Sequence, residues 1–111
     1  MRELNFMDIE VPKLKITLRS GIELQLVLPS VTLIERLRSG VKRLSKSITE
    51  NNLSDVRKYY ELAAELISCN LSKTTITADD LEMGEHFRIE DIVEFFAVYV
   101  EFIEEASSTK N

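Results

Sequence analysis

The chain has 111 residues, 44% of them hydrophobic, and a formal net charge of −5. This length suits one small domain with a modest core, and no apolar run is long enough to cross a bilayer. The first residues are charged in a way that a secretory leader is not, at Arg2, Glu3, Asp8 and Glu10. We therefore expect a soluble intracellular protein with one domain over residues 1–106 and a disordered tail over 107–111.

Charge is divided between two regions of the chain. Residues 74–106 are strongly acidic, with Arg88 as the one base. Residues 31–50 are mainly basic through Arg36, Arg38, Lys42, Arg43 and Lys46. This polarity favours charge-steered or head-to-tail assembly, and ordinary solvated helix faces are the alternative interpretation.

Residues 13–28 have the alternation of a β-hairpin. Every second residue is apolar on both arms, at Leu14, Ile16, Leu18, Ile22, Leu24, Leu26 and Leu28. Gly21 supplies the turn, and Pro29 ends the second strand because it lacks a backbone donor. The apolar residues before Pro12 follow no clean period, and they predict either an extra strand or a mobile arm.

A first helix is predicted after the hairpin. Thr32 and Glu35 have the spacing of a capping box, and Asn51 with Asn52 marks the end of the helix. Its apolar residues recur at helical spacing as Leu33, Leu37, Val41, Leu44 and Ile48.

A second helix and a short connector helix follow. Ser54 is the expected cap of the second helix, which ends near Asn70 and has an apolar face of Val56, Tyr59, Tyr60, Leu62, Ala63, Leu66 and Ile67. Thr77 and Asp80 predict a capped turn that runs to Gly84. With a last helix over 89–106, the expected fold is α+β and mostly α: an N-terminal hairpin, three main helices and a connector helix.

The last helix is apolar over about 220° of its circumference, which exceeds the usual core-facing stripe. At about 100° per residue, Ile92, Phe96, Tyr99 and Ile103 fall together. Val93 and Val100 lie on one flank, and Phe95, Val98 and Phe102 on the other. We expect one flank to bind another protein, with Phe95, Val98, Tyr99 and Phe102 as the candidate residues. The flank of Val93 and Val100, or complete burial of the helix within the fold, are the alternatives.

The sequence offers little for catalysis or metal binding. His86 is the one histidine, with no second imidazole or thiol nearby to complete a metal site. Cys69 lies in an apolar segment and is expected to act as a small buried hydrophobe. Gly21, Gly40 and Gly84 are isolated, so no phosphate-binding loop is present. We expect a non-enzymatic protein without catalytic, cofactor or metal residues.

Nucleic-acid binding through the basic first helix is the main alternative from another class. Its cations could line one exposed face, but no phenylalanine or tryptophan lies among them to stack on bases. The net negative charge also disfavours binding to a polyanion. We therefore expect no general affinity for DNA or RNA.

Four stretches of the chain resemble the small tail assembly chaperones of long-tailed bacteriophages and prophages of Gram-positive bacteria. They are ITLRSGIEL (16–24) with Leu28-Pro29, YELAAELI (60–67), ITADDLE (76–82) and IEDIVEFFAVYVEFI (89–103). The resemblance covers most of the chain and rests on the order of these stretches. None of them is a catalytic signature.

This resemblance implies a helical chaperone of the host cytoplasm that binds the tape measure protein, a long helical chain. Binding keeps that chain soluble until tail tube subunits polymerise around it. The resemblance also implies self-association, and in many family members a longer product made by ribosomal frameshifting near the end of the short reading frame. A structural subunit of the finished tail and a small bacterial adaptor are the alternatives within the protein-binding class.

Overall fold

A computed structural model describes residues 11–49 and 56–108 of the chain. In chain order the elements are β1, β2, α1, α2, the short π-helix η2 and α3, with bounds Leu14–Thr17, Glu23–Leu26, Val31–Thr49, Val56–Ile67, Asp80–Gly84 and Ile89–Ser108. The predicted class is confirmed: the fold is α+β and mostly α, and the hairpin precedes all of the helices.

The hairpin presents one apolar face to the helices. Leu14 pairs with Leu26 and Ile16 with Leu24, so the alternation of the two arms places these side chains on the same side of the sheet. Leu24 and Leu26 are buried there. The turn between the strands uses Gly21 at a φ of 99°, a left-handed conformation that glycine adopts without steric cost.

The free edge of β2 is covered by the loop that follows α2. Val27 N–H donates to the carbonyl of Cys69 at 2.9 Å, and Leu71 N–H donates to the carbonyl of Gln25 at 3.0 Å. Asn70 is buried between them, and its side-chain amide bonds Thr74 through both its nitrogen and its oxygen. The loop therefore ties the end of α2 to the hairpin without forming a regular third strand.

The cap of α1 differs from the prediction. The helix begins at Val31, and the Ser30 hydroxyl accepts a hydrogen bond from Leu33 N–H at 3.2 Å. Ser30, rather than Thr32, is thus the N-cap, because a capping side chain must precede the first helical residue and reach the third. The predicted apolar stripe is correct at Leu33, Leu37 and Leu44, which are all buried.

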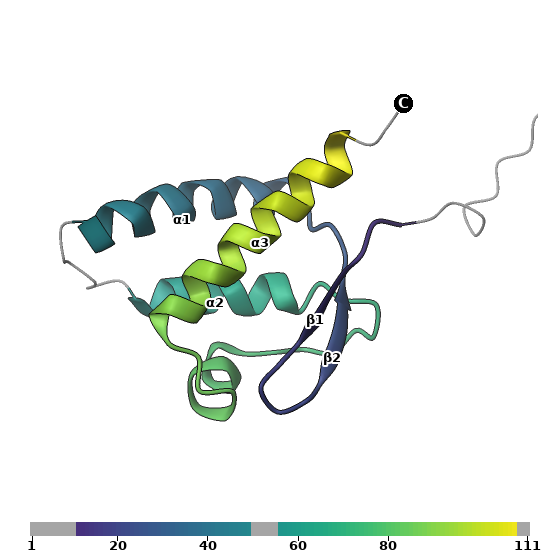
Figure 1. Cartoon of the computed structure of the whole chain (residues 1–111), viewed down its shortest axis with the longest axis horizontal. Helices are drawn as coiled ribbons and strands as arrows, with labels where there is room; N and C mark the ends of the chain where they lie inside the picture. Colours follow the sequence, from purple (N-terminus) through teal and green to yellow (C-terminus); the bar gives the residue numbers. More distant parts are fainter. Residues whose placement is uncertain (1–10, 50–55, 109–111) are drawn as a thin grey trace, which may run out of the picture.

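α1 and α2 run side by side, and α3 crosses them diagonally (Figure 1). α2 is the most enclosed helix, with the buried residues Tyr59, Tyr60, Leu62, Ala63, Ala64, Leu66 and Ile67. Gly40 permits its close approach to α1, because a Cβ at that position would stand 2.9 Å from Cδ2 of Leu62. A larger residue at position 40 would push the two helices apart.

The connector helix is capped as the sequence predicted, and it proves to be a π-helix. Thr77 N–H donates to the Asp80 carboxylate, and Asp80 N–H donates to the Thr77 hydroxyl. Arg57 on α2 holds the segment in place, since its guanidinium bonds Asp79 at 2.8 Å and Glu82 at 3.1 Å. These bonds raise the pKa of Arg57 above its ordinary value.

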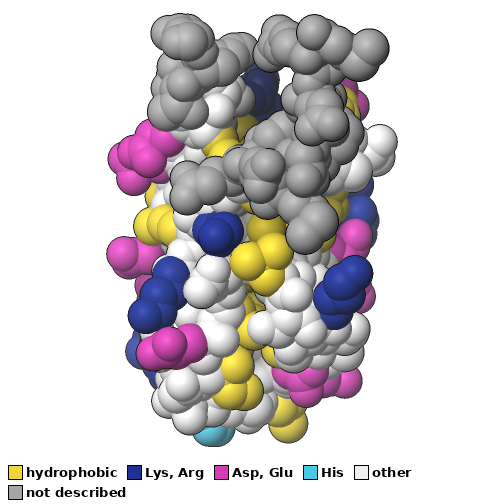
Figure 2. Space-filling model, turned by 90° about the vertical axis from the view of Figure 1, so that its right-hand side faces the viewer, with side chains coloured by type: hydrophobic (Ala, Val, Ile, Leu, Met, Phe, Trp, Pro, Cys, Tyr) yellow, Lys and Arg dark blue, Asp and Glu magenta, His cyan; other side chains and the backbone are white. Residues whose placement is uncertain are grey.

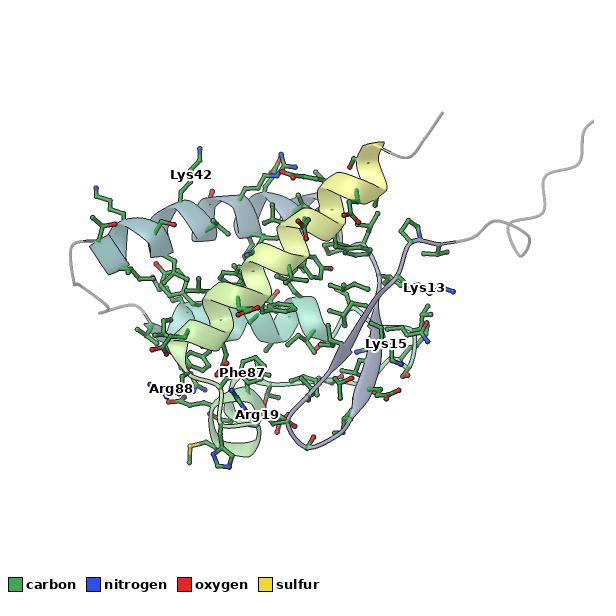
Figure 3. The ribbon with its side chains drawn as sticks, viewed as in Figure 1. Lys13, Lys15, Arg19, Lys42, Phe87 and Arg88 are labelled. Carbon is green, nitrogen blue, oxygen red and sulfur yellow. The ribbon has the colours of Figure 1, made fainter. Side chains whose placement is uncertain are left out.

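The hairpin turn is fastened to the segment that leads into α3. The carboxylate of Glu85, which is buried, accepts bonds from Ser20 N–H at 2.9 Å and from the Ser20 hydroxyl at 2.7 Å. Arg19 lies 5.7 Å from the centre of the Phe87 ring and donates to Asp91 at 2.9 Å (Figure 3). The turn and the start of α3 are thus joined over a long separation in sequence.

Some predictions fall outside the described residues. These are the arm or strand before residue 11, the end of the first helix at Asn51, and the cap at Ser54. At the other end of the chain, α3 continues through Ser108, beyond its predicted end at Ala106, and the rest of the tail predicted over 107–111 is also undescribed.

Replacing Glu85 by alanine should destabilise the fold by about 1.5 to 3 kcal/mol, because two hydrogen bonds to a buried charged group are lost. Ser20→Ala, which removes only the hydroxyl bond, should have the smaller effect. Urea unfolding followed by circular dichroism measures both. A Glu85→Ala variant within about 0.5 kcal/mol of the parent would show that the fastening contributes little.

Asp91 generates a prediction about acid stability. Its hydrogen bond from Arg19 and a second one from Arg88 N–H hold its pKa below the ordinary value. A lowered folded-state pKa stabilises the protein above the unfolded-state value of about 3.9, and the stabilisation is lost as the pH falls through the lowered pKa. Arg19→Gln should therefore raise the Asp91 pKa, though not fully, since the bond from Arg88 N–H remains.

Carboxyl chemical shifts in an NMR pH titration measure this change. Lys13→Gln is the matched control, because it removes one positive charge from an exposed position, whereas the groups that lower the Asp91 pKa are Arg19 and Arg88. The Asp91 pKa should stay unchanged in that variant. An equal rise in both variants would assign the effect to net charge instead of the hydrogen bond.

Candidate protein-binding groove

The flank of α3 that the sequence favoured for binding faces the core. Phe95 and Phe102 are 9% and 8% exposed, and Tyr99 is fully buried, whereas Val98 is 38% exposed. The structure therefore does not present these four side chains as one accessible surface. Their aromatic rings are occupied in packing, and Val98 is the member of the set that reaches solvent.

The rings of Phe95, Tyr99 and Phe102 pack against one another in succession along α3. The ring centroids of Phe95 and Tyr99 are 5.5 Å apart, and those of Tyr99 and Phe102 are 5.6 Å apart in an edge-on arrangement. The Tyr99 hydroxyl donates to the carbonyl of Val27 at 2.9 Å, just after β2. Burial raises the pKa of Tyr99, so the hydroxyl stays protonated and keeps this bond. This bond ties the aromatic flank of α3 to the chain just after β2.

An apolar groove lies on the other side of α3, between this helix and α1. Its volume is about 290 Å³. Four residues of each helix line it: Val41, Leu44, Ser45 and Ile48 from α1, and Val93, Phe96, Ala97 and Val100 from α3. Both sets have the spacing i, i+3, i+4 and i+7, which is the spacing of one continuous stripe along a helix.

The walls of the groove are partly open to solvent. Ile48 is 46% exposed and Val93 is 38% exposed. Val41 and Val100 are half-buried, while Leu44 and Phe96 form a buried floor. An apolar groove with exposed β-branched walls and a closed floor is suited to accept apolar side chains from another helix.

Charged side chains of opposite sign flank this groove. Arg38 and Lys42 are exposed on α1, and Glu94 and Glu101 are exposed on α3. In the described part of the chain, none of these four side chains forms an ion pair. Figure 3 shows Lys42 projecting away from α1 into open space. Their charges are therefore available to a bound partner.

Exposed apolar side chains also occur on the hairpin side, where Figure 2 shows them as a narrow line between charged side chains. Among the exposed residues of the hairpin and its adjoining loops are Ile22, Leu28 and Leu71. Exposed apolar side chains that alternate with charged ones in this way are common on protein surfaces. The α1–α3 groove differs because its apolar walls converge on a closed floor.

The cleft between α1 and α2 has a different character, because charged and polar side chains make up most of its lining. The Arg36 guanidinium there donates two hydrogen bonds to the Glu65 carboxylate of α2, with N···O distances of 2.9 and 3.0 Å. This pair raises the pKa of Arg36 and fixes its guanidinium to the protein itself. One cation of the basic helix is thus already neutralised by its own fold.

Potential reactive groups are separate from each other. Cys69 is half-buried, and burial raises the pKa of its thiol, which makes the thiol less nucleophilic. His86 is exposed in a left-handed conformation with a φ of 58°. Within residues 11–49 and 56–108, no group of three or more His, Cys, Asp or Glu side chains is arranged to hold a metal ion.

None of the helices in the described ranges combines the length and apolar character that a bilayer crossing requires.

The α1 wall of the groove was not part of the predicted binding site. Val41, Leu44 and Ile48 appeared in the sequence as an ordinary core stripe. The signal that could have marked them is the match between their spacing and that of Val93 and Val100. That match becomes informative only when the two helices are known to be neighbours.

No protein-family model, curated protein or solved structure matches this chain.

The buried aromatic flank can be tested against the exposed position on the same helix. Phe102→Ala should lower the free energy of unfolding by about 3 to 5 kcal/mol, because it leaves a cavity in the core. Val98→Ala should change it by less than about 0.5 kcal/mol, as is usual at an exposed position. Chemical unfolding of both variants gives the comparison. Similar small losses in both would mean that the Phe102 ring is accessible and that the originally expected flank is open.

Proposed function

We propose that this protein is a non-enzymatic assembly chaperone that binds a long helical protein chain in the groove between α1 and α3. In line with the resemblance to phage tail assembly chaperones, the proposed partner is a tape measure protein. Binding in the host cytoplasm would keep that chain soluble until tail tube subunits assemble around it. Self-association, which the resemblance also implies, is part of the same proposal.

The observation that carries the proposal is the groove itself. A long amphipathic helix aggregates through its apolar stripe unless another surface covers that stripe. The apolar walls of Val41, Ile48, Val93 and Val100 offer such a cover at the spacing of a helix stripe. Recognition of a helix by a groove of this kind needs apolar anchors and few directional contacts.

The surrounding charges support the chaperone role. Lys42 on one side and Glu101 on the other are exposed, so the protein surface beside the groove remains hydrated when the groove is filled. Such charges oppose uncontrolled association while the apolar walls make the contact.

An aspartate in the groove tests the proposal. Val93→Asp should reduce the amount of phage tape measure protein that co-purifies with this chain by about tenfold, since a buried unpaired carboxylate at the contact costs at least about 1.4 kcal/mol. Co-expression followed by pull-down and measurement of soluble tape measure protein gives the result. Both the variant and the parent should show the same circular dichroism spectrum, because Val93 is partly exposed.

Val98→Asp is the matched control. Val98 lies on the same helix and has the same exposed fraction as Val93, 38%, but it is not part of the groove. Co-purification should remain at the parental level in this variant. Loss in Val98→Asp with retention in Val93→Asp would return the binding surface to the flank that the sequence first favoured.

A further inference from the structure

The two rims of the α1–α3 groove carry opposite charges, and this constrains what binds there. Building on the proposed function, we infer that the occupant is a single amphipathic helix with acidic residues along one polar flank and basic residues along the other. Its acidic flank lies beside α1 and its basic flank beside α3.

The rim charges follow directly from the positions of the groove residues. Lys42 comes immediately after Val41, Glu94 after Val93, and Glu101 after Val100. One step along a helix turns a side chain by about 100° around the axis, so each charge stands on the outer side of a groove wall. The α1 rim therefore carries the positive charge of Lys42, with Arg38 one turn before it, and the α3 rim carries the negative charges of Glu94 and Glu101.

A partner helix in the groove brings both of its polar flanks close to these rims. A partner helix whose two flanks carry charges of the same sign would be attracted to one rim and repelled by the other. A helix with divided charges is attracted on both sides. Because exposed ion pairs contribute only modestly, the rims set partner choice and direction, while the apolar contact supplies most of the affinity.

The shape of the site favours a foreign helix over a second copy of this chain. Two copies related by a two-fold axis would place the same surface on both sides of the contact. Here that surface is a groove of about 290 Å³, so the contact would be concave against concave. Such a contact leaves an unfilled space and forfeits packing. A convex helix fills the groove.

The length of the groove defines how much of the partner one copy covers. Its walls span i to i+7 on each helix, which corresponds to about two turns, or roughly 10 Å. One copy therefore engages a short stretch of the partner. A long helical partner has room for several copies along its length, and the number bound should rise with the number of divided-charge stretches.

Two synthetic peptides of identical composition test the inference. Both carry leucines at i, i+3, i+4 and i+7 over three heptads. In the first, all glutamates lie on one flank and all lysines on the other, and in the second they alternate along both flanks. The first peptide should bind the full chain about fivefold to tenfold more tightly in fluorescence anisotropy at low salt, and high salt should reduce the difference.

A rim exchange tests the direction of binding. In a variant that exchanges all four rim charges (Arg38→Glu and Lys42→Glu on α1, Glu94→Lys and Glu101→Lys on α3), the divided-charge peptide should turn around in the groove. A spin label at the peptide N-terminus reports this, because it broadens amide signals at one end of the groove in the parent and at the opposite end in the variant. Lys58→Glu, which changes an exposed α2 lysine outside the groove, should leave the direction unchanged.

The outcomes separate the two proposals. Equal binding of both peptides, abolished by Val93→Asp, would overturn the divided-charge inference and leave the groove as a helix site. Absence of binding by either peptide would overturn the groove as a helix site as well. If Val93→Asp instead converted a dimer of the parent into a monomer, the occupant would be a second copy, and the inference would be wrong.

Discussion

The packing of α3 constrains most of the structure. This helix has large apolar side chains over more of its surface than one neighbour can cover. Ile92, Phe96 and Ile103 pack among the helices, while Phe95 and Phe102 extend the buried surface on the flank where Tyr99 bonds Val27. The carbonyl of Val27 satisfies the Tyr99 hydroxyl, and this bond holds the short chain after β2 against α3. The positions of the hairpin, of the turn that Glu85 holds and of the loop after α2 are all consistent with this contact between α3 and Val27.

The same packing leaves one part of the α3 surface incompletely covered. α3 crosses α1 and α2 diagonally, and the hairpin occupies only one of its flanks (Figure 1). Val93 and Val100 on the other flank line a groove with Val41 and Ile48 of α1. The groove is a consequence of how a small domain covers a broad apolar helix. In the proposed function, a partner helix completes that coverage, which links the architecture of the core to recognition.

The candidate site could be predicted only in part. Its location on α3 followed from the unusual width of the apolar arc, and the flank of Val93 and Val100 was one of the alternatives. The favoured flank was the aromatic one, because large rings are common at protein contacts. Rings are equally effective in a core, and periodicity does not say which neighbour covers them. The contribution of Val41 and Ile48 from α1 required knowledge of which helices touch.

The sequence by itself determined the order and type of the elements, the apolar stripe of each helix, and the reciprocal cap of Thr77 and Asp80. These features depend on residues that are close in the chain, so spacing and local hydrogen bonding define them. Tertiary structure alone decided that the rings of α3 are buried, that Gly40 allows α2 to pack closely against α1, and that unlike charges face each other across a groove. Those features depend on contacts between residues far apart in sequence. Such contacts form, and stabilise the protein, only when the whole chain has folded.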